Sequence, residues 1–388
     1  MNILYVHRTR ATGVEAVHIG QIVLGMRKLG HRVEMLSPVG EFIEHVTPAS
    51  TQATGRRGRL HGIGARLPEV LFELLEIAYS AKATLEGLRR FPAGSIDGVY
   101  ERYAIFGFAG ALIARWRRVP WVLEVNYTSE SPLVRPRSRL FKPLARLLDR
   151  WLFRSATHIF AVSSFLKRQL VDEFGVDERR ITITPNAADP AVFDPATVGV
   201  PGDALPQGPI IGFVGGFYPW HGVDLLLDAF LRIVERHPQA RLLLIGDGPM
   251  RQELQDRVSR LGLSGQVLMP GKVAHSKLAP YVNRFDIGVM PDSNLYGSPM
   301  KIFEYMSMAV PVVVPDYDPL TDVVDDGVQG RVFKRRDVAH LSACLDQLLG
   351  DAPARRQMGE RARQAVVDTH NWMNNARVAV EGLRSGMA

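Results

Sequence analysis

The sequence predicts an α/β protein built from two doubly wound, Rossmann-like domains. Three observations support this fold class. The chain's 388 residues exceed the size of an ordinary single core. Short apolar runs alternate with segments of helical periodicity, as in parallel sheets covered by helices. A Gly- and Pro-rich stretch without periodicity divides the chain near its middle. We therefore expect two sheets whose strand ends face one cleft.

The strand predictions follow the apolar runs in chain order. In the first half these runs occupy residues 2–6, 31–36, 98–101, 121–125, 158–162 and 181–185. In the second half they occupy residues 210–215, 240–246, 266–271, 287–291 and 311–315. We predict an N-terminal domain over 1–198, a linker over 199–208, a C-terminal domain over 209–367 and a terminal helix over 368–388.

Composition limits the function classes. No stretch approaches the ~18–20 apolar residues of a membrane span, and the N-terminus enters a strand without a signal-peptide pattern. We therefore expect a cytoplasmic protein, with peripheral contact to the inner face of the plasma membrane as an extension of that expectation. Cys344, the only cysteine, is predicted to be a buried structural thiol.

The net charge of +7 is unevenly distributed. Residues 1–200 contain 27 Lys and Arg against 19 Asp and Glu, and within 131–170 nine basic residues face one acid, Asp149. This half of the chain is suited to an anionic partner. The basic residues of the segment surround a stripe of Leu140, Leu144, Leu147, Leu148 and Trp151. The stripe predicts either core packing or contact with an anionic membrane.

Glycine-containing turns follow several strands of the second half. GFVGGFYPWHG places Gly215 and Gly216 at a strand end, and a helix is expected to begin near Val223. Gly246 in GDGP, and Lys272 with Val273 in MPGKV, end neighbouring strands in the same way. Glycine lets the backbone approach a phosphate, and a helix N-terminus supplies N–H donors. Gly-Gly turns also occur for steric reasons alone, so a single turn is weak support.

The segment SPMKIFEYM predicts an anion site at a helix start. Ser298 followed by Pro299 favours helix initiation, with serine as the cap. Lys301 then lies in the first turn, where the helix dipole disfavours a cation unless an anion is bound. Glu304, three residues later, lies on the same helical face and could accept hydrogen bonds from a ribose diol. The alternative is an ordinary Lys–Glu helical pair.

These segments resemble the retaining glycosyltransferases of family 4, which have the GT-B fold. The similarity extends over TGVEAVHIGQIVLGMRKLGHRV, IFAVSSFLKRQL, ITITPNAADPAVFDP, GFVGGFYPWHGVDLLLDAF, LLLIGDGP and SPMKIFEYMSMAVPVVV. The resemblance implies transfer of a sugar from a nucleotide diphosphate donor, bound mainly by the C-terminal domain. It also implies an acceptor bound mainly by the N-terminal domain and a C-terminal helix that crosses back to that domain.

The resemblance also assigns site residues, with departures. Glu304 matches the ribose-binding glutamate, whereas the sugar-facing glutamate of the family is Tyr296 here. The family's Arg and Lys at the diphosphate align with Gly216 and His221, so we predict that Lys301 replaces them as the main cation. The donor site implied by the resemblance comprises Gly13, Gly215, Gly216, His221, Gly246, Lys272, Val273, Tyr296, Ser298, Pro299, Met300, Lys301 and Glu304.

The catalytic candidates of the first domain are Arg102, Glu124 and Asn126, at or just beyond two strand ends. Asn126 occupies the position where the family often has a histidine. Lys301 completes the set. By resemblance we expect front-face attack, in which the leaving phosphate helps to take the acceptor proton. Structural roles remain open for Arg102 and Glu124.

The sequence therefore predicts a metal-independent retaining glycosyltransferase that extends a glycan or lipid-linked acceptor, as in bacterial cell-surface polysaccharide or glycolipid synthesis. No cofactor beyond the nucleotide sugar is expected. Asp316 and Asp318 in PDYDP offer a DxD-like metal site as an alternative. A soluble small-molecule acceptor, a nicotinamide dehydrogenase and a basic nucleic-acid binder are the competing functions. The chain lacks a fitting GxGxxG and any helix-turn-helix, RRM or zinc pattern.

Overall fold

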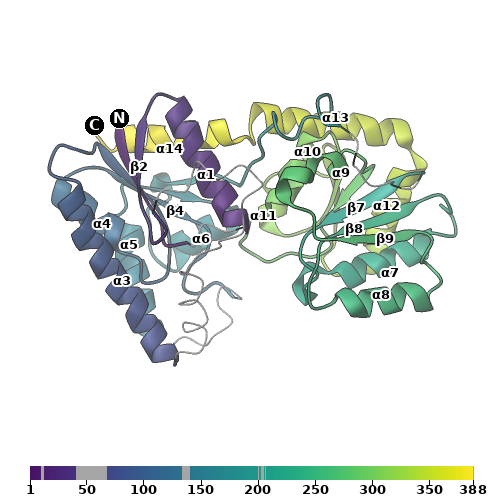
Figure 1. Cartoon of the computed structure of the whole chain (residues 1–388), viewed down its shortest axis with the longest axis horizontal. Helices are drawn as coiled ribbons and strands as arrows, with labels where there is room; N and C mark the ends of the chain where they lie inside the picture. The colour runs from purple at the N-terminus through teal and green to yellow at the C-terminus, as the bar shows by residue number, and fades with distance from the viewer. Residues whose placement is uncertain are drawn as a thin grey trace. The chain divides into compact units, whose positions relative to one another are not determined.

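The computed structural model describes residues 1–9, 13–40, 68–132, 140–199, 201, 205 and 207–387. The chain forms two compact units (Figure 1). Unit 1 consists of residues 1–185 and 372–388, and unit 2 consists of residues 186–371.

Unit 1 is built on a six-stranded parallel sheet of order β2-β1-β3-β4-β5-β6. The strands are β1 (Asn2–Val6), β2 (Arg32–Leu36), β3 (Gly98–Arg102), β4 (Trp121–Val125), β5 (His158–Ala161) and β6 (Ile181–Ile183). The helices are α1 (Gly13–Lys28), α3 (Glu69–Arg90), α4 (Ala109–Arg117), α5 (Lys142–Ser155), α6 (Ser164–Asp172), the short 3₁₀ helix η3 (Glu178–Arg180) and α14 (Trp372–Ser385).

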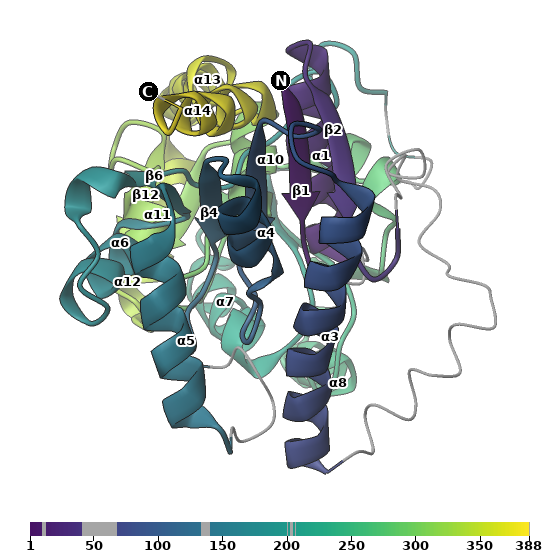
Figure 2. The ribbon, with the colours of Figure 1, turned by 90° about the vertical axis from the view of Figure 1, so that its left-hand side faces the viewer.

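Helices cover both faces of this sheet (Figures 1 and 2). The strands β1 and β4 are buried almost throughout, as the apolar runs predicted. α1 and α14 pack together, and a side chain at Gly25 would meet the Cβ of Ala376 at 2.6 Å. Asn375 of α14 also donates from Nδ2 to the carbonyl of Pro185 (2.8 Å). The last helix of the chain is therefore part of the first unit.

Unit 2 repeats the architecture, with strand order β12-β11-β10-β7-β8-β9. The strands are β7 (Ile210–Val214), β8 (Arg241–Ile245), β9 (Val267–Gly271), β10 (Ile287–Val289), β11 (Val312–Pro315) and β12 (Gly330–Phe333). The helices are η4 (Pro219–His221), α7 (Val223–Ile233), α8 (Arg251–Arg260), η5 (His275–Lys277), α9 (Ala279–Val282), α10 (Met300–Ser307), α11 (Asp318–Thr321), α12 (Val338–Gly350) and α13 (Ala352–Asp368).

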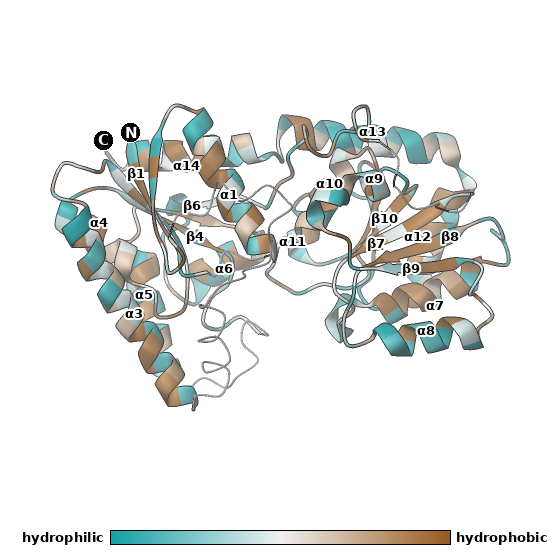
Figure 3. Ribbon diagram, viewed as in Figure 1, coloured by the Kyte–Doolittle hydropathy of each residue, from teal (hydrophilic) through white to brown (hydrophobic). Residues whose placement is uncertain are grey.

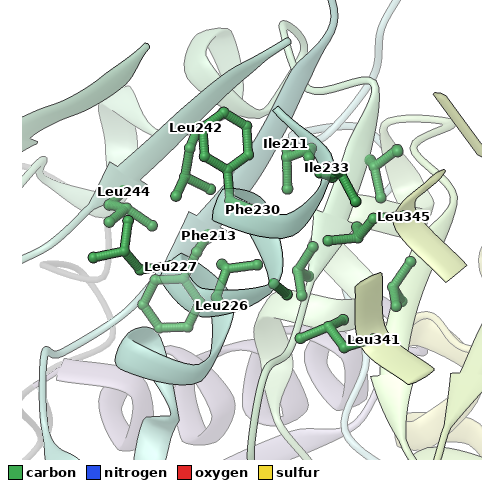
Figure 4. Close-up of a cluster of buried hydrophobic side chains, with 14 of the residues drawn as sticks. Ile211, Phe213, Leu226, Leu227, Phe230, Ile233, Leu242, Leu244, Leu341 and Leu345 are labelled. Carbon is green, nitrogen blue, oxygen red and sulfur yellow. The ribbon is translucent and has the colours of Figure 1, made fainter. Parts of the chain in front are cut away.

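Two cores, one on each face of the second sheet, follow from strand alternation. On one face Ile211, Leu242 and Leu244 pack with Phe230 of α7 and Leu345 of α12 (Figure 4). On the other face, residues one position along the same strands pack with α9, α10 and α13. The strand residues include Ile210, Leu243 and Ile245, and the helices contribute Ile302 and Phe303 of α10 and Val366 of α13. Strands buried on both faces explain the continuous apolar runs in the sequence, which colour the strands brown in Figure 3.

The predicted fold class is confirmed, since both sheets are parallel and doubly covered. The predicted strands correspond to β1–β11, and β12 was not predicted. Cys344 is buried in the core of unit 2, as expected for a structural thiol. Residues 186–198, which we placed in the first domain, belong to unit 2. Half of the predicted linker at 199–208, namely residues 200, 202–204 and 206, lies outside the described residues.

Contacts with α10 and the residues before it explain why residues 186–198 belong to unit 2. The backbone N–H of Asn186 donates to Ser298 Oγ (3.0 Å), and Phe193 is buried in the second core of unit 2. The carbonyl of Phe193 accepts from the hydroxyl of Ser307 (2.7 Å). The segment therefore packs on α10, and the compact division of the chain falls after Pro185.

Candidate active site

Two glycine turns meet at the carboxyl edge of the sheet in unit 2. The chain leaves β7 through Gly215 (φ +156°) and leaves β8 through Gly246 (φ +152°). A side chain at 246 would lie 1.8 Å from the carbonyl oxygen of Gly215, so only glycine permits this approach. The two turns predicted from sequence are thus adjacent and present backbone at one point of the sheet edge.

Lys301 reaches the same point from the first turn of α10. A side chain at Gly215 would lie 2.6 Å from Lys301 Nζ, so the glycine makes room for the ammonium group. The ammonium lies 4.5 Å from the centroid of the Phe213 ring, a cation–π distance. Burial lowers the pKa of Lys301 from its usual value to about 8, and the nearby Glu304 opposes that shift. A bound anion would restore the charge that burial disfavours.

The alternative, an ordinary Lys–Glu helical pair, is not what the structure contains. Within the described part of the chain, Lys301 forms no ion pair with Glu304. The buried carboxylate of Glu304 instead binds His275 Nε2 at 2.7 Å. Burial disfavours the charge on His275, but the hydrogen bond and the charge of Glu304 outweigh it and raise the pKa of His275. The ring of Phe193 packs against the imidazole edge, with centroids 5.7 Å apart.

His221 lies beside Lys301 and does not supply the positive charge of the family's lysine at this position. Its Nδ1 contacts the carbonyl oxygen of Gly216 at 2.5 Å. Burial, followed by the charge of Lys301, lowers the pKa of His221 to about 4, so the ring is neutral at physiological pH. A side chain at Gly216 would meet the ring of Tyr218 at 2.5 Å. Gly216 has no side chain and His221 is neutral. Of Gly216, His221 and Lys301, only Lys301 can therefore place a positive charge beside the Gly215 turn.

The predicted cap of α10 is wrong. The helix begins at Met300 after Pro299, and no side chain caps it. Ser298 Oγ accepts from the backbone of Asn186 (3.0 Å), and the Ser298 carbonyl accepts from Asn186 Nδ2 (2.5 Å). Because a residue 112 positions away occupies the hydroxyl, local sequence could not reveal this contact. The backbone N–H groups at the start of α10 consequently have no serine cap.

The remaining predicted donor residues lie in two loops of unit 2 and in unit 1. Lys272 is exposed and Val273 half-buried in the loop after β9, which leads to His275. Tyr296 is half-buried in the loop before α10, where its N–H donates to Asn294 Oδ1 (3.0 Å). Gly13, at the first residue of α1 with φ +63°, belongs to unit 1. The structure thus gathers Gly215, Gly246, His221, Lys301 and Glu304 within unit 2.

The three N-terminal candidates form one cluster in unit 1. Glu124 is the last residue but one of β4, is 3% exposed, and accepts from Asn126 Nδ2 (2.6 Å) and from Arg102 on the same oxygen. Its other oxygen accepts from the Tyr100 hydroxyl (2.8 Å) and contacts His18 Nε2 (2.9 Å). Burial disfavours this carboxylate, but His18 and Arg102 outweigh burial and hold the pKa of Glu124 far below its usual range.

This geometry separates the roles within the cluster. Glu124 directs both oxygens to protein groups, whereas Arg102 and Asn126 are half-buried at the strand ends. Glu124 is therefore placed to position its two neighbours rather than to contact a ligand. His18 of α1 was missed as a member. Its segment, TGVEAVHIGQ, contributes to the family resemblance, but nothing in the sequence shows that Glu124, 106 positions away, is the partner of His18.

The DxD-like alternative has a partner of its own. Asp316 forms an ion pair with Arg335 Nε (2.9 Å) and accepts from the Arg335 backbone (2.8 Å). Asp318 begins α11. Among the described residues, no group of three or more His, Cys, Asp or Glu side chains is placed to hold a metal ion. The expectation of metal independence remains a prediction.

The two parallel, doubly wound sheets place the chain in the GT-B class of α/β proteins, and solved glycosyltransferases share the fold. A glycosyltransferase from Rickettsia africae superimposes with a TM-score of 0.73 over 100% of this chain and 98% of that chain, at 18% identity. HepE from Anabaena, solved with UDP-glucose, gives a TM-score of 0.69 over 99% of this chain and 100% of that chain, at 16% identity.

Family comparison is more specific. Residues 13–192 match the family described as "Glycosyltransferase Family 4", and residues 203–365 match "Glycosyl transferases group 1". The chain belongs to this family of glycosyltransferases. The predicted resemblance is confirmed.

Two named relatives match most of this chain. The 2-deoxystreptamine glucosyltransferase of Streptomyces kanamyceticus is 27% identical over 68% of this chain and 70% of the relative. The D-inositol 3-phosphate glycosyltransferase of Nocardia farcinica is 26% identical over 80% of this chain and 70% of the relative. Within the described residues, every helix is too short or too polar to cross a bilayer.

Proposed function

We propose that this glycosyltransferase is a retaining, metal-independent enzyme that moves a sugar from a nucleotide diphosphate sugar to a glycan or lipid-linked acceptor. The observation that carries the donor assignment is the meeting of Lys301 with the Gly215 turn, while Glu304 lies one helical turn further along α10. An anion at Lys301 followed by a diol at Glu304 corresponds to the diphosphate and ribose of one nucleotide.

Charge development in the reaction supports this assignment. As the bond from the anomeric carbon to the diphosphate oxygen breaks, negative charge grows on the phosphate. The Lys301 ammonium and the uncapped N–H groups of α10 are placed to stabilise that charge. The acceptor oxygen forms the new bond to the anomeric carbon on the same face, and its proton passes to the departing phosphate. Stereochemical retention follows from attack on that face.

His275 supports the ribose contact. Its imidazole holds one oxygen of Glu304, which fixes the rotamer of the carboxylate and leaves the second oxygen for a hydroxyl donor. In unit 1, Glu124 plays the corresponding positioning role for Arg102 and Asn126. We assign these two half-buried side chains to the acceptor and the transferred sugar.

Ligand-induced thermal stabilisation tests the donor assignment. A ligand that binds only the folded state raises stability by about 2.7 kcal/mol at one hundred times its Kd. UDP and UDP-glucose are the first probes, followed by other nucleoside diphosphates and their sugars. We expect one nucleotide series to raise Tm in the wild type and to raise it much less in Glu304→Ala. No stabilisation by any series would contradict the assignment.

A small soluble acceptor is the second candidate. The names of the two relatives given above refer to 2-deoxystreptamine and D-inositol 3-phosphate, which are small polar molecules. Once the donor is known, sugar transfer to such molecules can be compared with transfer to lipid-linked glycans. Transfer to the small molecules alone would replace the proposed acceptor class without affecting the donor site.

A further inference from the structure

Helix α3 carries its apolar side chains on the outside. In the first two turns Val70, Leu71, Leu74 and Leu75 are all exposed, and Leu75 reaches 55% exposure. The brown lower half of α3 in Figure 3 corresponds to this face. A helix that packs against a protein core normally buries such a face and exposes its charges.

The acidic side chains of the same turns point inward. Glu73 is completely buried and accepts from the backbone N–H of Phe141 (2.9 Å). Glu76 forms an ion pair with Arg8 (2.6 Å). The polarity of this half of α3 is therefore inverted, with carboxylates toward the protein and leucines toward the surroundings. Contiguous exposed apolar side chains of this kind indicate an interaction surface.

Helix α5 repeats the inversion beside it. Asp149 is buried and accepts from the Tyr103 hydroxyl (2.6 Å), while Leu144, Leu147 and Trp151 are exposed. The Phe141–Glu73 hydrogen bond joins the start of α5 to α3, and both helices extend toward the same end of unit 1 (Figure 2). The core-packing interpretation of the sequence stripe therefore fails for these three residues, although Leu148 is half-buried.

The exposed charges of α5 are all positive. They belong to Lys142, Arg146, Arg150 and Arg154, and the helix has no exposed acid. An open groove of about 350 Å³ lies between apolar and cationic side chains of this helix, lined by Leu147, Arg150, Trp151, Arg154 and Ser155. Apolar side chains beside cationic ones match a bilayer surface, where acyl chains lie beneath anionic headgroups.

We propose that α3 and α5 together form a docking surface for an anionic lipid bilayer. The docking surface comprises Val70, Leu71, Leu74 and Leu75 of α3, with Leu144, Leu147 and Trp151 of α5, flanked by the basic residues of α5. A second copy of the chain is a poorer occupant, because a symmetric contact would place the two basic helices against each other. This inference goes beyond the proposed function and needs no donor or acceptor.

Cosedimentation with vesicles tests the docking surface in the full-length protein. Vesicles of phosphatidylcholine with phosphatidylglycerol are compared with vesicles of phosphatidylcholine alone. We expect the wild type to bind the anionic vesicles and to dissociate as salt is added. Failure of the wild type to bind anionic vesicles at low salt would overturn the proposal.

Two variants separate the apolar and the electrostatic contributions. Leu71→Ser with Leu75→Ser removes apolar area from α3 and should weaken binding about tenfold or more. Lys142→Glu, Arg146→Glu and Arg150→Glu should weaken it at least about fivefold per position. The matched controls lie in unit 2 at exposed positions: Leu231→Ser with Val367→Ser, and Arg260→Glu with Arg356→Glu and Arg361→Glu. The controls should bind like the wild type.

The same variants identify other occupants of the surface. If the leucine variant binds vesicles normally but melts several degrees lower than its control, the α3 face is covered by protein and the proposal is wrong. If it converts a self-associating protein to a monomer in analytical ultracentrifugation without changing vesicle binding, a second copy covers the face. If controls and variants lose vesicle binding equally, the attraction is general charge and the docking surface is rejected.

Discussion

Lys301 is the residue on which the proposed donor site depends, and its charge state gives a pH-dependent prediction. The folded pKa of about 8 lies below the ~10.4 of an unfolded lysine. Between these values the unfolded state binds more protons, so stability should rise with pH across that window. Lys301→Met should be as stable as the wild type or more stable at neutral pH. The difference should vanish above about pH 10.

Turnover measured on the same variant separates function from packing. Because phosphate charge grows toward the transition state, Lys301→Met should lower kcat by roughly two orders of magnitude and change nucleotide affinity less. Lys277→Met, an exposed lysine of the same unit, is the control. A variant with a lower melting temperature and wild-type turnover would show that Lys301 has only a packing role.

His275 gives a second pH prediction with the opposite sign. Its pKa is raised in the folded state by the hydrogen bond and charge of Glu304. The protonated pair therefore stabilises the fold fully below about pH 6.5, the unfolded pKa, and this contribution is lost as pH rises through the raised value. Urea unfolding should show that His275→Gln is less stable than the wild type in acid, with a smaller difference in base.

A double variant tests whether the pair is the cause. Glu304→Gln removes the charge that raises the pKa of His275. In that background, adding His275→Gln should therefore cause no pH-dependent change in stability. A difference that persists in the Glu304→Gln background would assign the effect to another partner of His275.

The sequence could predict which residue types meet at this site but not all their partners. Spacing in one helix places Lys301 and Glu304 on the same side, and strand-end glycines indicate an approach to an anion. The partner of Glu304 lies 29 residues earlier, on the loop after β9, and the partner of Ser298 lies 112 residues earlier. Contacts that distant depend on the whole fold, and local propensity carries no information about them.

At the level of elements, strands were easier to predict than the direction in which a helix faces. β12 escaped prediction because it is a four-residue edge strand with the half-buried Arg331 at its second position. For α3, helical periodicity indicates an apolar stripe but does not say whether the stripe faces the core or the surroundings. The inward contacts of Glu73 with Phe141 and of Glu76 with Arg8 settle that direction only when the neighbouring segments are in place.

The turn after β8 provides a prediction at this scale. Gly246→Ala would place a methyl group 1.8 Å from the Gly215 carbonyl oxygen at a positive φ, so the backbone of both turns must shift. We expect a loss of unfolding free energy on the order of 2–4 kcal/mol. Gly350→Ala, where the new methyl group meets nothing within 4 Å, is the control. Equal melting temperatures for the two variants would show that the turns adapt easily.

At the level of the whole molecule, the metal requirement is the simplest test of chemistry. Activity should survive EDTA, because in the proposed mechanism Lys301 and the N–H groups of α10 stabilise the leaving phosphate without a divalent ion. Full loss of activity, restored by Mg²⁺ or Mn²⁺, would instead favour a metal site that includes Asp316 and Asp318. Replacing Asp316 with Asn would then abolish the metal response.

The division of the chain into two units gives the last prediction, because α14 stabilises unit 1 although it follows unit 2 in sequence. Ala376 is completely buried against Gly25, and Trp372 packs edge-on against His18, with centroids 5.0 Å apart. Ala376→Leu should overpack this contact and cost about 1–3 kcal/mol in unit 1 alone. Exposed Ala339 of α12 offers the control Ala339→Leu. In calorimetry, a bound nucleotide should raise the unfolding temperature of unit 2. Ala376→Leu should lower the unfolding temperature of unit 1. A single transition that responds to both changes would show that the two units unfold together.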